Sequence, residues 1–353
     1  MASTSVTIRD VARVAGVSKS AVSAALTGNG RIAPQTKAAI TQVAAEMGFE
    51  PNPHARRLQG KGLSQTIGLF TLDLDLSVGT SKIKHIRKLL TRQGFEVTIH
   101  SCSYPDGSNI RETVREMKLL CQQRPRAIIC NTTDLPVEVF EALQSYRAQG
   151  GVLLCYDRAV DTECDQVIFD REDNTFQAAN HLLKLGHRDI GFFAVSPFKA
   201  SDPRVMGLTR ALAQYDLKPR ADWLYGSTLY GEFEEDGATM AAYFLGLAQR
   251  PTAVCIVNDY AAIAFISVVQ RAGLRVPEDV SVVGHDNRSM ARYCNVPLSS
   301  VSHPVEVIAQ SVVDGLLQRL NGDVDAPFQR EIVKGELTVR QSTSAPSPSK
   351  PTI

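Results

Sequence analysis

Short apolar runs alternate with helical patterns along most of this 353-residue sequence, and the alternation occurs twice. The first series of runs is TIGLF, EVTIHS, AIIC and GVLLCYD, and the second is QVIFD, DIGFFAV, TAVCIVND and VSVVGHD. Patterns such as SKIKHIRKLLTRQG and LPVEVFEALQSYRAQG lie between them and have helical periodicity. Because alternating strands and helices build parallel sheets covered by helices on both faces, the sequence predicts two doubly wound α/β lobes.

Polar side chains follow several of these predicted strands. Ligands of doubly wound sheets bind at the carboxyl ends of the strands, so residues there are the first candidates for a binding site. They are Asp73, Asp75, Asp157, Arg158, Asn258, Asp259 and Asp286, with Arg204 before a predicted helix. Polar residues also cap strand ends and helix starts without binding a ligand, and that alternative stays open for each residue taken singly.

Composition and missing motifs exclude several classes of protein. No apolar run approaches the ~18 residues of a membrane span, and the N-terminus lacks the pattern of a signal peptide, so we expect a cytoplasmic protein. The seven cysteines are scattered without a Cys-x-x-Cys pair. That distribution favours buried reduced thiols, and we expect neither a metal nor a cofactor. Hydrolase, nucleotide-loop and metalloprotease motifs are missing, and we interpret His187, at a predicted helix end, as structural. We therefore expect a binding protein and not an enzyme.

The first 50 residues have a different pattern, with three short predicted helices and many small side chains. Thr7 and Asp10 have the spacing of a capping box before IRDVARVAG, and Ser18 caps KSAVSAAL. Gly16 lies in the turn between these helices and Val22 is an apolar anchor in the second, a spacing typical of a helix-turn-helix. A third helix follows in PQTKAAITQVAAEMGF. Such a domain can place one helix in the DNA major groove, although a small helical domain without nucleic acid is the alternative.

The charge distribution favours nucleic-acid binding. Residues 1–62 carry eight Lys and Arg against three Asp and Glu, whereas the remainder carries 30 basic and 34 acidic side chains. The stretch FEPNPHARRLQGKG ends this basic region with a short predicted helix that places Leu58 beside arginines. A helix so short is marginal in isolation. An apolar side chain on a basic helix suits insertion between base steps in the minor groove.

These features together resemble the LacI/GalR family of bacterial transcription regulators. TIRDVARVAGVSKSAVS and GFEPNPHARRL, with the spacing between them, are similar to the family's headpiece and hinge. NTFQAANHLLKLGHRDIGFF, AVCIVNDYAAIAF and GLRVPEDVSVVGHD are similar to its effector core, which extends to about residue 340.

The resemblance implies a division of the chain. The expected parts are a helix-turn-helix headpiece over 1–50, a hinge helix and linker over 51–63, and an effector-binding and dimerisation core over 64–340. Within the core we expect an N-lobe of about 64–158 plus 288–318 and a C-lobe of about 159–287 plus 319–340. The Ser- and Pro-rich residues 341–353 are expected to form a disordered tail.

The resemblance also implies roles for individual residues. The DNA-binding candidates are Thr7, Ser18, Lys19, Ser20, Ser23, Ala24, Asn29, Asn52, Ala55, Arg56 and Leu58. The effector-binding candidates are Asp73, Asp157, Arg204, Phe233, Asn258 and Asp286, with Tyr230 as an alternative to Phe233. Lys19, Ser20 and Ala24 match the family's base-reading positions, and the residue that matches Leu58 opens the central operator step. The carboxylate, amide and guanidinium groups of this set suit a ligand rich in hydroxyls.

Three departures from the family pattern concern specificity. Ala24 replaces a long polar side chain, the loop TLDLDLSVGTSK lacks an Asn-Pro-Phe-Phe-like segment, and His285 and Asn287 replace two residues of Gly-Phe-Asp-Asp. We predict a homodimeric repressor that binds double-stranded operator DNA and responds to a small molecule, a sugar or related metabolite. The operator, the effector and the direction of its effect stay open. The alternative is a solute-binding protein without a regulatory role.

Overall fold

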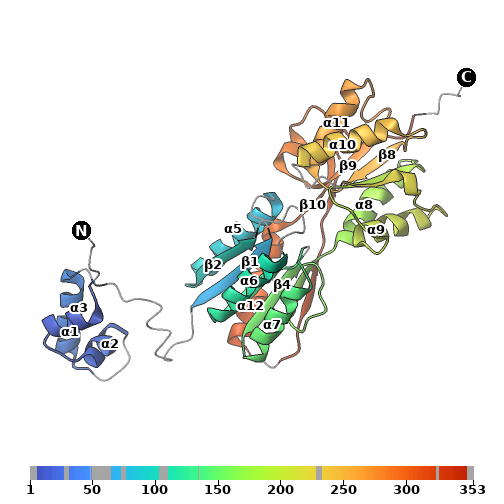
Figure 1. Ribbon diagram of the computed structural model, residues 1–353. Helices are drawn as coiled ribbons and strands as arrows, with labels where there is room; N and C mark the ends of the chain where they lie inside the picture. The colour runs from blue at the N-terminus through green and yellow to red at the C-terminus, as the bar shows by residue number, and fades with distance from the viewer. Residues whose placement is uncertain are drawn as a thin grey trace, which may run out of the picture. The chain divides into compact units, whose positions relative to one another are not determined.

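The computed structural model describes residues 6–27, 32–47, 49, 65–72, 77–102, 110–133, 135–227, 233–322 and 326–347 (Figure 1). They form two compact units that divide after residue 64. The expected DNA contacts Asn29, Asn52, Ala55, Arg56 and Leu58 and the expected effector residues Asp73, Asp75 and Tyr230 lie outside the described residues. Among the described helices, none is long and apolar enough to cross a membrane.

The first unit is a bundle of α1 (Ile8–Val14), α2 (Lys19–Thr27) and α3 (Pro34–Glu46). Its core consists of the buried side chains of Val11, Ala12, Val22, Ala25, Ile40 and Ala44. Three of these six are alanines, which allow the helices to approach closely. Gly16 has a φ of 64°, in the left-handed region that favours glycine, and so permits the sharp turn into α2. The predicted helix-turn-helix is confirmed.

The N-lobe of the second unit is a parallel sheet in the strand order β11-β5-β4-β3-β1-β2. The strands are β1 (Thr66–Leu72), β2 (Glu96–Cys102), β3 (Ala127–Asn131), β4 (Val152–Asp157), β5 (Asp165–Phe169) and β11 (Arg330–Val333). Helices α5 (Ser77–Arg92) and α12 (Val305–Asn321) pack on one face, and α6 (Ile110–Gln122) and α7 (Glu138–Ala148) pack on the other. Each face therefore has its own apolar core.

The C-lobe repeats this plan in the strand order β12-β10-β9-β8-β6-β7. The strands are β6 (Ile190–Ala194), β7 (Leu224–Gly226), β8 (Ala253–Ile256), β9 (Ser281–Asp286), β10 (Ser299–Ser302) and β12 (Leu337–Thr338), and only the pairing of β12 with β10 is antiparallel among those described. Helices α8 (Arg171–Lys184) and α9 (Pro203–Ala213) cover one face, and α10 (Phe233–Gly246) and α11 (Asp259–Arg271) cover the other. The short 3-10 helices are η1 (Ala221–Trp223) and η2 (Ser289–Arg292). The prediction of two doubly wound lobes is confirmed.

In the described part of the chain, three segments pass between the lobes: β5 to α8, β10 to α12, and β11 to β12. The expected lobe boundaries are wrong at each of them. The strands β5 and β11 and all of α12 belong to the N-lobe, whereas β10 and η2 belong to the C-lobe. The reason is that strand pairing is decided at long range. β5 lies beside β4, with Asp165 opposite Leu154, and nothing in DQVIF itself specifies that neighbour.

The expected disordered tail needs a second correction. Residues 341–347 lie on the C-lobe, and residues 348–353 are outside the described residues. Ser342 is fully buried and its hydroxyl donates to the carbonyl of Val282 at 2.6 Å. The Nε2 atom of His187 lies 2.9 Å from the carbonyl oxygen of Ser344, and its Nδ1 atom lies 2.9 Å from the hydroxyl of Thr252. Composition predicted disorder, but these backbone and hydroxyl groups have specific partners. They also confirm that His187 is structural.

Most of the cysteines are buried reduced thiols, as predicted. All seven have free thiols, and five of them are buried. Cys121 and Cys294 are partly exposed. Among the described residues, no group of three or more His, Cys, Asp or Glu side chains is arranged to hold a metal ion.

Candidate functional site

The first turn of α2 presents a polar surface to solvent. Ser18, Lys19 and Ser20 are exposed there, whereas Ser23 and Ala24 are partly buried one turn later. The hydroxyls of Ser18 and Ser20 lie 2.9 Å apart, and Ser18 Oγ accepts a hydrogen bond from the backbone of the third residue of the helix at 3.2 Å. A helix N-terminus with an exposed lysine and exposed hydroxyls has donors that suit phosphate and base edges.

The start of α1 is held by its own polar pair. The backbone N–H and the hydroxyl of Thr7 both donate to the carboxylate of Asp10, at 3.0 and 2.6 Å. These hydrogen bonds lower the pKa of Asp10. Thr7 is therefore engaged in capping, and a DNA contact by its side chain has to share or replace the bond to Asp10. The cap stabilises the first turn of α1.

Two aspartates occupy matching positions in the two lobes. Asp157 is the last residue of β4 and Asp286 is the last residue of β9. Both have left-handed backbone conformations, with φ values of 93° and 96°. Such conformations are costly for residues other than glycine and concentrate at ligand sites. Their location at carboxyl ends of parallel strands is where a doubly wound sheet binds ligands.

Asp157 is buried in a dense polar environment. Lys82, on α5, donates to Asp157 Oδ2, and the side chains of this pair are 3% and 2% exposed. Asn131 Nδ2, at the end of β3, and Thr133 Oγ1, two residues later, donate to the same oxygen at 3.1 and 3.3 Å. One carboxylate oxygen is thus saturated by partners from two separate elements of the N-lobe.

The segments that connect the lobes supply the remaining partners of Asp157. Arg171, at the start of α8, donates to the Asp157 carbonyl at 3.2 Å and lies 3.8 Å from Oδ1. His303 Nε2, between β10 and α12, is also 3.8 Å from Oδ1. Burial opposes ionisation, but Lys82, Arg171 and His303 together hold the pKa of Asp157 well below its usual range. The carboxylate is therefore ionised at neutral pH.

The guanidinium of Arg204 is already paired within the C-lobe. Its Nε and Nη2 atoms donate to Asp202 at 3.0 and 2.9 Å, and Asp202 also caps α9 by accepting from the Arg204 backbone. Arg158, which follows β4 in the N-lobe, lies 3.8 Å from the same carboxylate. Burial opposes the ionisation of Asp202, but these arginines lower its pKa. A ligand that uses Arg204 must share it with Asp202.

Asn258 and Phe233 lie at the first turns of α11 and α10. Asn258 Oδ1 accepts from the backbone of Tyr260 and Ala261 at 2.8 and 3.2 Å, so this oxygen caps α11. Its amide nitrogen is the group that is left to donate to a ligand. The rings of Phe233 and Tyr260 stack at 6.5 Å between centroids. These two candidates therefore share Tyr260 as a neighbour, whereas Asp157 and Asp286 share His303.

Histidines and a buried aspartate surround Asp286. His303 Nδ1 lies 3.5 Å from Asp286 Oδ1. His285, one residue earlier on β9, places Nδ1 at 2.9 Å from the Ile256 carbonyl, and burial lowers its pKa. Asp259 is fully buried, and burial together with the charge of Asp286 raises its pKa to about 7.

Several of these side chains were not predicted from the sequence. They are Lys82, Asn131, Thr133, Arg171, Asp202 and His303. Asn131 and Thr133 directly follow the strand AIIC, so the signal that singled out Asp157 also applied to them. His303 follows the strand β10, which the sequence pattern did not predict. Lys82 lies in the middle of a helix and has no local signal at all.

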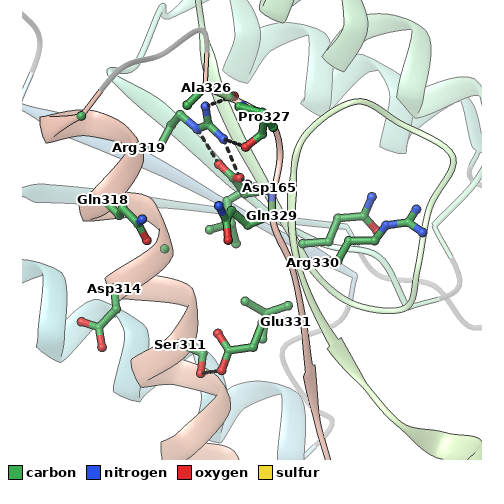
Figure 2. A pocket seen from close by; sticks show the side chains of 15 residues that line it. Asp165, Ser311, Asp314, Gln318, Arg319, Ala326, Pro327, Gln329, Arg330 and Glu331 are labelled. Carbon is green, nitrogen blue, oxygen red and sulfur yellow. Dashed lines mark hydrogen bonds and ion pairs between the residues drawn. The ribbon is translucent and has the colours of Figure 1, made fainter.

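A separate pocket of about 520 Å³ lies between α12, β5 and β11 (Figure 2). Arg319 crosses it and donates from Nε and Nη2 to the carboxylate of Asp165, both at 2.8 Å, and from Nη1 to the carbonyl of Ala326 at 2.6 Å. Asp165 is the first residue of β5, so the pocket is at the amino end of the sheet. Its central charges are paired with each other, and we assign it a structural role in holding the connection to β11.

Comparisons with known proteins agree with this architecture. Residues 7–52 match the family described as bacterial regulatory proteins, lacI family, and residues 179–343 match the periplasmic binding protein-like domain. The HTH-type transcriptional repressor PurR of Vibrio campbellii is 30% identical over 341 residues, which cover 95% of this chain and 98% of that protein. PurR of Vibrio cholerae serotype O1 (strain M66-2) is 29% identical over 329 residues, 92% of this chain and 94% of that protein.

Solved structures of regulatory proteins have the same fold as this chain. A lac repressor dimer bound to operator and the anti-inducer ONPF has a TM-score of 0.81 and 25% identity, over 97% of this chain and 100% of that chain. A complex of the transcriptional regulator CelR with cellobiose has a TM-score of 0.68 and 23% identity, over 96% of this chain and 99% of that chain.

Proposed function

Because the chain belongs to the LacI family of bacterial regulatory proteins, we propose that it represses transcription as a homodimer on double-stranded operator DNA, under the control of a small molecule bound between its lobes. It is a regulator and not an enzyme. The observation that carries the effector part is the pair Asp157 and Asp286. They end matching strands of the two lobes and face one histidine from opposite sides.

The chemistry of the cleft supports a polar effector. Two carboxylates, the Asn258 amide and the Arg204 guanidinium are groups that bind hydroxyls in pairs. The relatives include a regulator solved with cellobiose and a family member from Enterococcus faecium solved with ribose. We propose a sugar or related metabolite for this chain, with Asp157, Arg204, Asn258 and Asp286 as contacts and Phe233 as an apolar surface beside them. Action on DNA further supports a cytoplasmic location.

The headpiece supports base reading by α2. The exposed side chains of Lys19 and Ser20 lie at its first turn, and Ala24 lies one turn later. A solute-binding protein without a regulatory role is the weaker alternative, because residues 7–52 match the lacI family of bacterial regulatory proteins and the helices α1 and α2 form the expected helix-turn-helix.

The DNA part is tested by selecting operator sequences from a random library with the full chain. Lys19→Ala and Ser20→Ala should each remove ~1–3 kcal/mol of discrimination between the selected site and random DNA. Lys84→Ala, an exposed lysine on α5 of the core, is the matched control and should leave discrimination unchanged. Equal losses on selected and random DNA would show that α2 does not read bases.

The effector part is tested by the thermal stability of the full chain with D-ribose, cellobiose and related saccharides. A saccharide that binds should raise the melting temperature of the core, and Asp286→Asn should abolish that rise. Asp161→Asn, at an exposed position away from the strand ends, is the control. A saccharide that stabilises both variants equally would place its site outside this cleft.

A further inference from the structure

His303 is the one described residue whose ring contacts the strand-end aspartates of both lobes. It lies in the connection from β10 to α12, and its side chain is 8% exposed. Nδ1 is 3.5 Å from Asp286 Oδ1, and Nε2 is 3.8 Å from Asp157 Oδ1. The ring packs against Phe169, at 3.9 Å between centroids, and Phe169 ends β5 where another connection between the lobes begins.

A neutral imidazole cannot donate a hydrogen bond to both aspartates. It has one N–H, whereas two carboxylates face its two nitrogens. If Nδ1 carries the hydrogen and faces Asp286, the lone pair of Nε2 faces Asp157. His303 Nε2 and Asp157 Oδ1 are both buried, and neither makes a hydrogen bond to any described residue. Within the described part of the chain, two buried acceptors 3.8 Å apart therefore have no hydrogen-bond donor, which is a costly arrangement.

The charged groups around the ring come from four elements. Lys82 on α5 and Arg171 on α8 are positive, and Asp157 on β4 and Asp286 on β9 are negative. Burial and then Lys82 lower the pKa of His303, while the two aspartates oppose that change. The pKa of His303 is therefore lowered from its ordinary value, and the ring is neutral at pH 7. Asp73 and Asp75 lie outside the described residues.

We propose that effector binding in this cleft is coupled to the release of a proton from His303. A proton on Nε2 satisfies this pair by donating to Asp157 Oδ1. Two adjacent hydroxyls of an effector, or an amine, satisfy the same pair by donating to Asp157 Oδ1 and to the Nε2 lone pair. Proton and effector therefore exclude each other: protonated His303 and effector give neutral His303 with effector bound, and the proton passes to solvent.

The coupling to an effector rests on the proposed function. The two contacts of the His303 ring with Asp157 and Asp286, here called the His303 bridge, do not depend on that proposal. The competition predicts that effector affinity falls about tenfold for each pH unit below the pKa of His303, and is constant above it. His303 then contributes to effector specificity. A ligand that presents only hydrogen-bond acceptors to His303 Nε2 and Asp157 Oδ1 is excluded, because both of these atoms are acceptors themselves.

The bridge is tested on the ligand-free full chain by NMR of labelled histidines, with the His303 signal assigned from its loss in His303→Gln. We expect His303 to titrate below pH 6.5, the ordinary value, and Asp286→Asn to lower its pKa further. Asp157→Asn should act in the same direction, and Asp286→Asn decides the question if Asp157→Asn does not fold. The signal of His181, which bonds to Thr343 instead, should not move. A His303 titration that is unchanged in Asp286→Asn would overturn the bridge.

The coupling is tested by calorimetry with D-ribose and cellobiose in two buffers of different ionisation enthalpy, one pH unit below the measured pKa of His303. We expect close to one proton to be released on binding to the unmodified chain and none in His303→Gln. His181→Gln, a change at another partly buried histidine, should keep the release. Binding without proton release would overturn the inference and leave the proposed function standing. If neither saccharide binds, the saccharide part of the proposed function fails, and the titration of His303 still decides the bridge.

Discussion

At the scale of single residues, the polar cluster around Asp157 depends on a buried ion pair between α5 and β4. Transfer of two charges out of water costs several kcal/mol, and the mutual attraction of Lys82 and Asp157 offsets it together with hydrogen bonds from Asn131 and Thr133. Removal of one member leaves the other buried with fewer partners. The pair therefore adds little to the net stability of the fold, and its main effect is to favour one specific arrangement of the side chains around Asp157.

Lys82→Met should lower the free energy of unfolding of the core by about 3 kcal/mol, because Asp157 then stays buried without its closest cation. Urea denaturation followed by circular dichroism measures this. Lys88→Met removes an exposed lysine from the same helix and should change stability by less than about 0.5 kcal/mol. Equal effects of the two substitutions would contradict the assignment of a buried pair.

Asp259 predicts a pH dependence of stability. Its carboxylate accepts from Ser300 Oγ and from the Arg288 backbone, both at 2.6 Å, yet burial and Asp286 raise its pKa from 3.8 to about 7. The folded protein thus holds this proton more tightly than the unfolded chain. Its contribution to stability is present below pH 4 and is lost as the pH rises to about 7.

Asp259→Asn should remove that loss, because an amide resembles the protonated carboxyl and the Ser300 hydroxyl can turn to accept from it. The free energy of unfolding of the variant, relative to the original chain, should rise between pH 4 and pH 7 by up to roughly 4 kcal/mol, at about 1.4 kcal/mol per pH unit. Above pH 7 the difference should be constant. Urea titrations across this range measure it, and a difference that is flat from pH 4 to 8 would show that Asp259 is ionised throughout.

At the scale of elements, the C-terminal segment acts as a further part of the C-lobe. Ser342 exchanges two hydrogen bonds with Val282 on β9, at 2.8 and 2.6 Å, and Ser344 bonds to the buried His187. The contact with Val282 lies on the same strand, β9, that carries His285 and Asp286. The segment therefore supports the strand from the end opposite to the effector site.

Truncation after Arg340 should destabilise the C-lobe by about 2–4 kcal/mol, since it removes several hydrogen bonds and takes away the Ser342 carbonyl that accepts from the buried Val282 backbone N–H. Truncation after Ser347 is the matched control and keeps all of these contacts. Calorimetric unfolding of the two truncated chains distinguishes them. If both unfold like the full chain, the segment does not contribute to the lobe.

At the scale of the whole molecule, the proposed ligand site and the proposed DNA site belong to separate compact units of one chain. If the effector controls DNA binding, a coupling free energy must link the two sites. The coupling is reciprocal, so DNA must change the affinity for the effector by the same factor. Arg204 is suited to the ligand side because its pairing with Asp202 must adjust to a bound effector. Leu58, in the expected hinge, belongs to the DNA side.

Arg204→Ala should keep operator affinity and lose most of the response to effector, whereas Leu58→Ala should weaken operator binding and leave effector affinity in DNA-free protein unchanged. In the original chain, operator and effector should change each other's affinity by one common factor. Effector titrations with and without the selected operator measure that factor. Identical effector affinities in both titrations would mean that the two units are not coupled.

The alternation of strands and helices was determined by the sequence itself, apart from short strands such as β10, because strand runs, helical periodicity, the left-handed Gly16 and the N-cap Ser18 are local features that need no distant partner. The same holds for Asp157 and Asp286, which a parallel strand places at its carboxyl end whatever the rest of the fold does. The tertiary structure alone decided that β5 joins the first lobe, that Lys82 is buried against Asp157, and that His303 stands between the two aspartates. These contacts join elements far apart in the chain, and long-range packing decides such pairings because no local pattern distinguishes one partner from another.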